Sequence, residues 1–157
     1  PTIEGEIGSF SPDGKWLTFP KVVDPGEQRH LVLVDLSSDM AVQHDLIPDD
    51  DLSNDQEAAW MGDSKSLLVA RLSPDLHAVT AAQLYAVDAQ TGQSSPLVVD
   101  PAYSHNSLQV SPTGDAVLFQ RFPLDKPGGQ TELWTINLTT HALTRLVVNG
   151  TSARWLP

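Results

Sequence analysis

A repeat of about fifty residues constrains the fold of this chain more than any other feature. One block joins an apolar lead-in, a polar turn and a second apolar stretch, and it occurs at 10–19, 60–69 and 110–119. A second block, with the pattern Leu-x-x-(Val/Ile)-(Asp/Asn), occurs in the same order at 31–35, 84–88 and 133–137. Because the two blocks recur together, the chain is built from three similar units.

Each unit is predicted to consist of β-strands. In the first block, Ser11-Pro12-Asp13-Gly14 has the residues that a tight turn needs: a Pro that presets φ, an Asp that accepts bonds from nearby backbone, and a Gly that tolerates positive φ. After the turn, Leu17 and Phe19 lie two positions apart, the spacing that places both side chains on one face of a strand. The second block and the apolar stretch after it supply two more strands, giving four per unit.

Units of this length with four short strands predict an all-β fold of β-propeller blades, each a sheet of four antiparallel strands. We expect three blades, with unit boundaries near 1–53, 54–103 and 104–149. Residues 150–157 are expected to form the first strand of a further unit, because Trp155 there matches Trp60. The result would be a partial propeller in one domain.

The motifs of these units resemble a known repeat family. The first unit carries Phe10-Ser11-Pro12-Asp13-Gly14-Lys15, and the second carries Leu84-Tyr85-x-Val87-Asp88 followed by Thr91-Gly92. This pattern is similar to the TolB-type (WD40-like) β-propeller repeat, which also occurs in the propellers of dipeptidyl-peptidase and prolyl-oligopeptidase relatives. The second unit departs from it with Met61-Gly62-Asp63-Ser64. The resemblance implies a bacterial, extracytoplasmic (periplasmic or secreted) protein that binds a protein or peptide through its loops.

Charge and composition exclude several classes of function. Twenty Asp and Glu residues against nine Lys and Arg give a net charge of −11, so the basic face required for nucleic-acid binding is missing. With no cysteine, disulfides and thiolate chemistry are excluded. No apolar run has the length needed to span a bilayer, so membrane insertion is not expected.

The densest cluster of charge is acidic and is predicted to lie on the connection between the first and second units. Its carboxylates are a candidate calcium site, and calcium is the one cofactor that the sequence brings into consideration. The candidate ligands are Asp49, Asp51, Asp55 and Glu57. The cluster lacks the central glycine of an EF-hand loop, and a solvated acidic connector is the alternative interpretation.

Basic residues recur at one position of the repeat, just after the second predicted strand. They are Lys21, Arg71 and Arg121. Such a set could contact an anion or an acidic partner. The alternative is that each makes a salt bridge or packs its stem at a strand end.

No catalytic arrangement is recognisable in the sequence. There is no Gly-x-Ser-x-Gly elbow and no glycine-rich phosphate loop, and the five histidines share no metal-binding spacing. We therefore predict a non-enzymatic binding or scaffold module. Two alternatives stay open: the regulatory propeller of a serine peptidase whose catalytic domain is absent here, and an extracytoplasmic sensor domain of a membrane-anchored protein.

Three blades are too few to close a ring, since propellers use roughly four to eight. One expectation is a homodimer that pairs three blades with three to give six. The other is a longer gene product that supplies the missing blades, which the start at Pro1 rather than Met favours.

Overall fold

The computed structural model describes residues 8–23, 28–37, 42–47, 52–72, 81–125 and 129–156. These residues form strands and no helix. The strands are β1 (Ser9–Phe10), β2 (Trp16–Val23), β3 (Gln28–Asp35), β4 (Val42–Asp45), β5 (Asn54–Trp60), β6 (Ser66–Leu72), β7 (Gln83–Asp88), β8 (Ser94–Val98), β9 (Tyr103–Val110), β10 (Ala116–Pro123), β11 (Glu132–Asn137) and β12 (Leu143–Val148).

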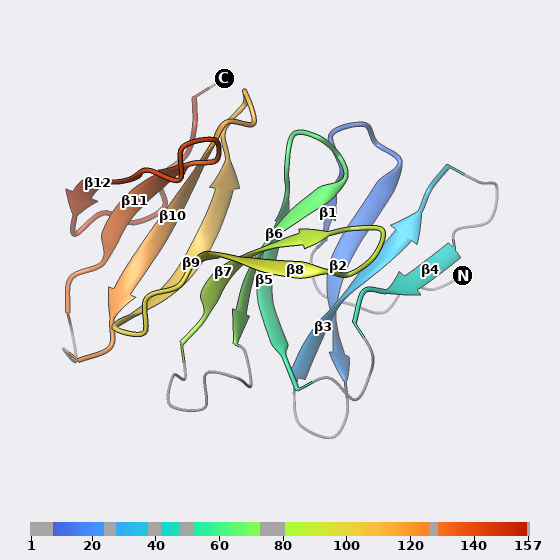
Figure 1. Cartoon of the computed structure of the whole chain (residues 1–157), viewed down its shortest axis with the longest axis horizontal. Coiled ribbons are helices and arrows are strands. Elements are labelled where there is room, and N and C mark those ends of the chain that lie inside the picture. The colour runs from blue at the N-terminus through green and yellow to red at the C-terminus, as the bar shows by residue number, and fades with distance from the viewer. Residues whose placement is uncertain are drawn as a thin grey trace.

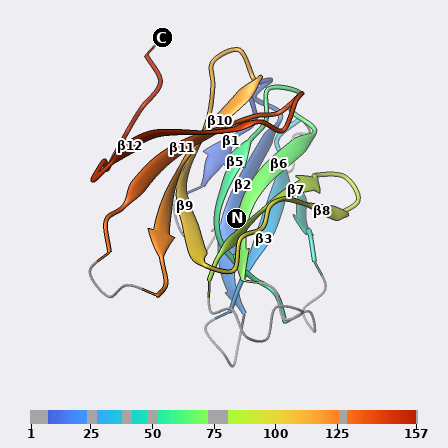
Figure 2. The same ribbon diagram turned by 60° about the vertical axis from the view of Figure 1, so that its left-hand side comes forward.

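The strands form three antiparallel sheets of four strands each, in chain order: β1 to β4, β5 to β8 and β9 to β12. We call these sheets the first, second and third blades. They stand side by side with the second blade in the middle, as Figure 1 shows, and Figure 2 gives the same arrangement turned by 60°. This is the partial propeller that the repeat predicts.

The predicted turns have the expected chemistry. Gly14 and Gly114 adopt φ of 72° and 74° between the first two strands of their blades. Ser64 takes the same place in the second blade with a φ of 56°, in the left-handed region that favours glycine. Asp13 Oδ1 accepts a bond from the Lys15 backbone N–H at 3.2 Å, and Asp63 Oδ1 accepts the equivalent bond from Lys65 at 2.9 Å.

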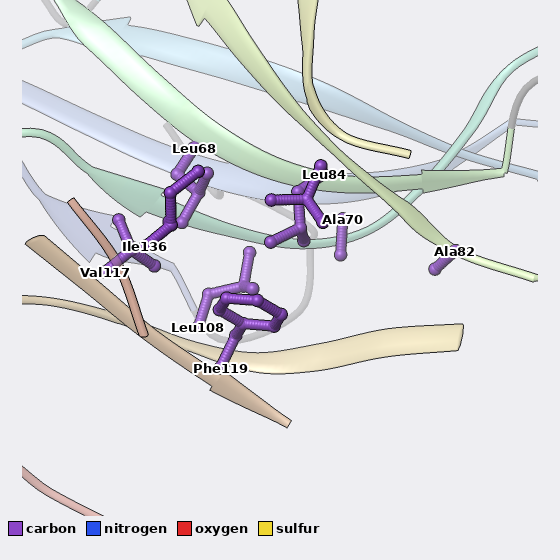
Figure 3. Close-up of a cluster of buried hydrophobic side chains, with 9 residues drawn as sticks. Leu68, Ala70, Ala82, Leu84, Leu108, Val117, Phe119 and Ile136 are labelled. Atoms are coloured by element: carbon purple, nitrogen blue, oxygen red, sulfur yellow. The ribbon is translucent and has the colours of Figure 1, made fainter. Parts of the chain in front are cut away.

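Alternating side chains of each blade pack against the next blade. The largest buried cluster joins the second and third blades, with Leu68, Ala70 and Leu84 on one side and Phe119 and Ile136 on the other (Figure 3). A second cluster joins the first and second blades. It contains Leu31, Leu33, Trp60, Leu67, Val69 and Val87. Because a single four-stranded sheet cannot cover both of its faces, this serial packing supplies the core.

Specific hydrogen bonds also join the innermost strands of neighbouring blades. The Trp60 indole Nε1–H in β5 donates to the Ser9 carbonyl of β1 at 3.1 Å. Phe10 has the repeat position of Trp60, yet its side chain is 66% exposed, since among the described residues no sheet packs on that side of the first blade.

The C-terminal segment differs from expectation in secondary structure. Residues 150–156 form no strand, although a first strand of a further unit is predicted there. Trp155 is nevertheless held against the third blade by a bond from its indole Nε1–H to the Gln109 carbonyl at 3.1 Å. Among the described residues, no helix is long and apolar enough to cross a membrane.

Candidate functional site

The three basic residues at the repeated position all have carboxylate partners. Arg71 of β6 lies directly opposite Asp55 of β5, and its Nε and Nη2 groups donate to the two carboxylate oxygens at 2.5 and 3.2 Å. The side chains are 6% and 0% exposed. This is a dry, bidentate ion pair within one blade, in which removal of either member would leave a buried charge.

Arg121 of the third blade uses a different partner. Its cross-strand neighbour is His105, and its guanidinium reaches Asp100 on the connection between β8 and β9. The guanidinium also lies over the rings of Tyr103 and Trp134, with centroid distances of 3.9 and 4.7 Å. Arg121 is therefore fixed by one carboxylate and two aromatic faces.

Lys21 of the first blade makes the most exposed pair. Its Nζ lies 3.5 Å from Asp45 Oδ1 of β4, and the two side chains are 35% and 42% exposed. All three basic side chains thus lie against carboxylates of this chain, the arrangement of the salt-bridge alternative. Binding of an external anion by Lys21, Arg71 and Arg121 stays a prediction.

The structure describes two of the four candidate calcium ligands, Asp55 and Glu57, so the calcium site stays a prediction. Asp49 and Asp51 lie outside the described residues. Asp55 and Glu57 belong to β5 rather than to the connector on which the sequence places them. Within the described part of the chain, no group of three or more His, Asp or Glu side chains could hold a metal ion.

Glu57 connects the second and third blades by hydrogen bonds. Its carboxylate accepts bonds from the backbone N–H groups of Ser107 and Leu108, at 2.7 and 3.0 Å. Ser107 has a φ of 54° and lies in an irregular stretch of the β9–β10 pairing, so these amides are turned away from the regular ladder. Burial raises the pKa of Glu57, and the two N–H donors counteract that rise.

His105 is a buried histidine that the sequence analysis did not single out. Its ring is fully buried, Nδ1 lies 3.1 Å from the Ala82 carbonyl, and Nε2 has no hydrogen-bond partner among the described residues. The pKa of His105 is lowered to about 4, mainly by burial; the Arg121 charge also lowers it, whereas the bond to the Ala82 carbonyl and the Asp100 charge act in the opposite direction. His105 occupies the repeat position of Asp55, which is the signal by which it could have been found.

A groove with a volume of about 620 Å³ lies between the outer strands of the first blade and the β7–β8 hairpin of the second blade. Trp16, Leu33 and Leu46 give it apolar walls, and Asp88 and Thr91 lie on the hairpin side. The Trp16 ring lies beside the His44 ring, with centroids 6.5 Å apart.

Backbone geometry holds the hairpin against this groove. Gly92 has a φ of 71°, and a Cβ at that position would collide with the Leu46 carbonyl oxygen. Asp88 accepts bonds from the backbone N–H groups of Gln90 and Thr91, at 3.0 and 2.8 Å. The hairpin therefore has a defined shape, and at Gly92 it lies too close to the Leu46 backbone for any side chain.

Comparison with known proteins gives structural likeness alone. No protein-family model matches this chain, and no curated protein matches its sequence. Solved structures do match. One is a puromycin-hydrolysing peptidase of Mycobacterium tuberculosis, with a TM-score of 0.66 over 88% of this chain at 13% identity. Another is an oligogalacturonate lyase in complex with manganese, with a TM-score of 0.65 over 91% of this chain at 12% identity.

An oligogalacturonate lyase of Vibrio parahaemolyticus gives a TM-score of 0.61 at 17% identity. This chain spans 21% of the peptidase and 41% and 38% of the two lyases. At such identities the likeness shows the fold, a partial propeller, and does not carry over activity. The TolB-type repeat stays a prediction from the motifs.

Proposed function

We propose that this chain is a non-enzymatic binding module of the TolB-like propeller type, and that it binds a peptide segment of a partner protein. The observation that supports this best is the groove between the first and second blades. A concave site with apolar walls and a few fixed polar groups is the usual form of a ligand site. By contrast, the buried arginines of the second and third blades form ion pairs with carboxylates of this chain.

The groove favours a peptide that carries an apolar and a basic side chain. Trp16, Leu33 and Leu46 offer apolar contact, and the face of an indole ring attracts a cation. Asp45 and Asp88 place carboxylates at the groove, where Lys21 pairs with Asp45 and Lys65 also lines the wall, so the attraction for a basic peptide comes from the net charge of −11 of the whole chain. A basic peptide would be steered toward such a surface, and an acidic one would be repelled.

Selection from a random peptide library against the 157-residue chain tests the proposal. We expect basic, apolar peptides to be enriched, and Trp16→Ala to weaken their binding by about tenfold or more, equivalent to about 1.4 kcal/mol. Phe10→Ala is the matched control, because Phe10 is an exposed aromatic residue that does not line the groove. Failure to enrich any peptide, or equal affinity for both variants, would contradict the proposal.

A second candidate is the regulatory propeller of a serine peptidase, supported by the likeness to the peptidase structures. In that case a hydrolase domain would be encoded beside these blades. Sequencing the complete coding region separates the candidates, because a reading frame that holds only further repeats rules out the peptidase. The extracytoplasmic setting belongs to the binding-module proposal, and cell fractionation of the native protein tests it.

A further inference from the structure

The outer face of the third blade has the same repeat positions that, in the first and second blades, pack against the following blade. We define this face by Leu118, Gln120, Leu133 and Val147, which alternate with the side chains that pack against the second blade. The C-terminal segment lies against it, since a Cβ at Gly150 would come within 2.6 Å of Leu133 Cδ1.

The C-terminal segment makes the contact of a first strand. Trp155 Nε1 donates to the Gln109 carbonyl, as Trp60 Nε1 donates to the Ser9 carbonyl, and both bonds measure 3.1 Å. Ser9 and Gln109 hold the same repeat position, one residue before Phe10 and Val110. Trp155 therefore stands on the third blade where Trp60 stands on the first.

The outer face of the third blade is exposed at β12, the part that the outer strands of another blade would cover. Val98 at the end of β8 is 5% exposed because the third blade packs on it, whereas Val147, its counterpart in β12, is 44% exposed. Leu97 packs against the same cluster, whereas its counterpart Leu146 is 55% exposed. The deeper residues Leu118 and Leu133 are only 5% and 7% exposed.

We propose that the outer face of the third blade, together with the segment 150–155, is a docking surface for three further antiparallel strands of the same repeat. These strands would take the segment 150–155 as the first strand of a fourth blade. In the second blade, the strands that follow Trp60 bring Leu67 and Val69 against Leu31 of the first blade. Leu133 has the repeat position of Leu31 and is already 7% exposed, so the incoming strands would mainly cover Val147 beside it, which is 44% exposed.

The position of the C-terminal segment decides between this occupant and a second copy of the chain. The first blade already has its own innermost strand, β1, paired with β2. A second copy that docked its first blade here would bring β1 to the place that Trp155 and its neighbours occupy. Strands that lack a first strand of their own fit the surface without displacing anything.

Thiol labelling tests the proposal, because the chain has no cysteine. In the 157-residue chain, we expect Val147→Cys to react at least about tenfold faster than Val98→Cys, since only the latter is covered. The chain is then extended after Trp155 by a copy of residues 61–98, which carry the last three strands of the second blade. The extension should slow the labelling of Val147→Cys to the rate of Val98→Cys.

An extension of equal length made of Gly and Ser is the control and should leave the rate unchanged. A folded extension with the repeat sequence that leaves Val147→Cys fully reactive would overturn the proposal. Slow labelling of Val147→Cys in the unextended chain would also overturn it, whether the slow rate is seen at every protein concentration or only at high concentration. Light scattering on the same samples identifies a second copy as the occupant in the concentration-dependent case.

Discussion

The second and third blades have the same topology and different surroundings. Among the described residues, the second blade lies between two sheets and the third packs against one, so the paired positions Val98 and Val147 differ in exposed fraction, 5% against 44%. Their basic residues differ as well. Arg71 pairs with a carboxylate within its own blade and lies 5.9 Å from the Tyr85 ring centroid, whereas Arg121 pairs with Asp100 on a connection and lies closer to two aromatic rings, at 3.9 and 4.7 Å.

This comparison separates what a repeat position determines from what a neighbour determines. The position sets the strand, the direction of the side chain and the type of residue, as Arg71 and Arg121 show. The neighbouring element sets the burial and the partner. Conserved spacing within a repeat is therefore weak support for a shared binding role, and each basic residue has to be judged from its own contacts.

The largest effect is expected in the second blade. Asp55→Ala leaves Arg71 buried without its partner, and we expect the free energy of unfolding to fall by about 3–5 kcal/mol. Urea denaturation measures the change. Asp100→Ala should cost less in the third blade, because Asp100 is 38% exposed and Arg121 keeps its aromatic contacts.

The double variant Asp55→Ala with Arg71→Met is the control for this prediction, because it removes both charges and should recover most of the loss. Equal costs for Asp55→Ala and Asp100→Ala would break the proposed distinction between the two blades.

A smaller effect, confined to the third blade, is expected from pH. The pKa of His105 is lowered to about 4 from an ordinary value of 6.5, so the folded state binds this proton less readily than the unfolded state. The stability that the neutral ring contributes is fully present above pH 6.5 and is lost as the pH falls through 6.5 toward 4. The loss amounts to about 3 kcal/mol.

Urea denaturation between pH 7 and 4 measures this dependence, with His105→Gln as the variant that removes the titrating group. We expect a shallower loss of stability in the variant than in the natural chain over this range. Identical pH dependence in both proteins would show that His105 does not titrate in this way.

Much of the fold follows from the sequence because turn chemistry and strand periodicity act locally. The positive φ of Gly14, Gly92 and Gly114 and the strands around them are the structure that those motifs predict. The start of β5 was harder to predict. Asn54, Asp55 and the residues after them are polar, so they read as a connector, and only the Arg71 guanidinium across the sheet allows Asp55 to be buried.

The groove could not be predicted for a different reason. Trp16 and Gly92 belong to different blades, and they face the same groove because the β7–β8 hairpin approaches the Leu46 backbone, just after β4. No short sequence motif predicts that the hairpin of one blade lies against the end of the neighbouring blade. The paired positions 55 and 105, by contrast, were available from the repeat itself, and aligning them would have marked His105 as a strand residue opposite Arg121.

Hydrogen–deuterium exchange of β8 and β12 in the 157-residue chain tests the central claim most directly. Both are the outermost strands of their blades, and only β8 is followed by another blade that packs on its end. We predict that the amides of β8 exchange at least about tenfold more slowly than those of β12, a difference of about 1.4 kcal/mol in opening free energy. Equal rates, or slower exchange in β12, would contradict a series of blades that is covered between the second and third and open beyond the third.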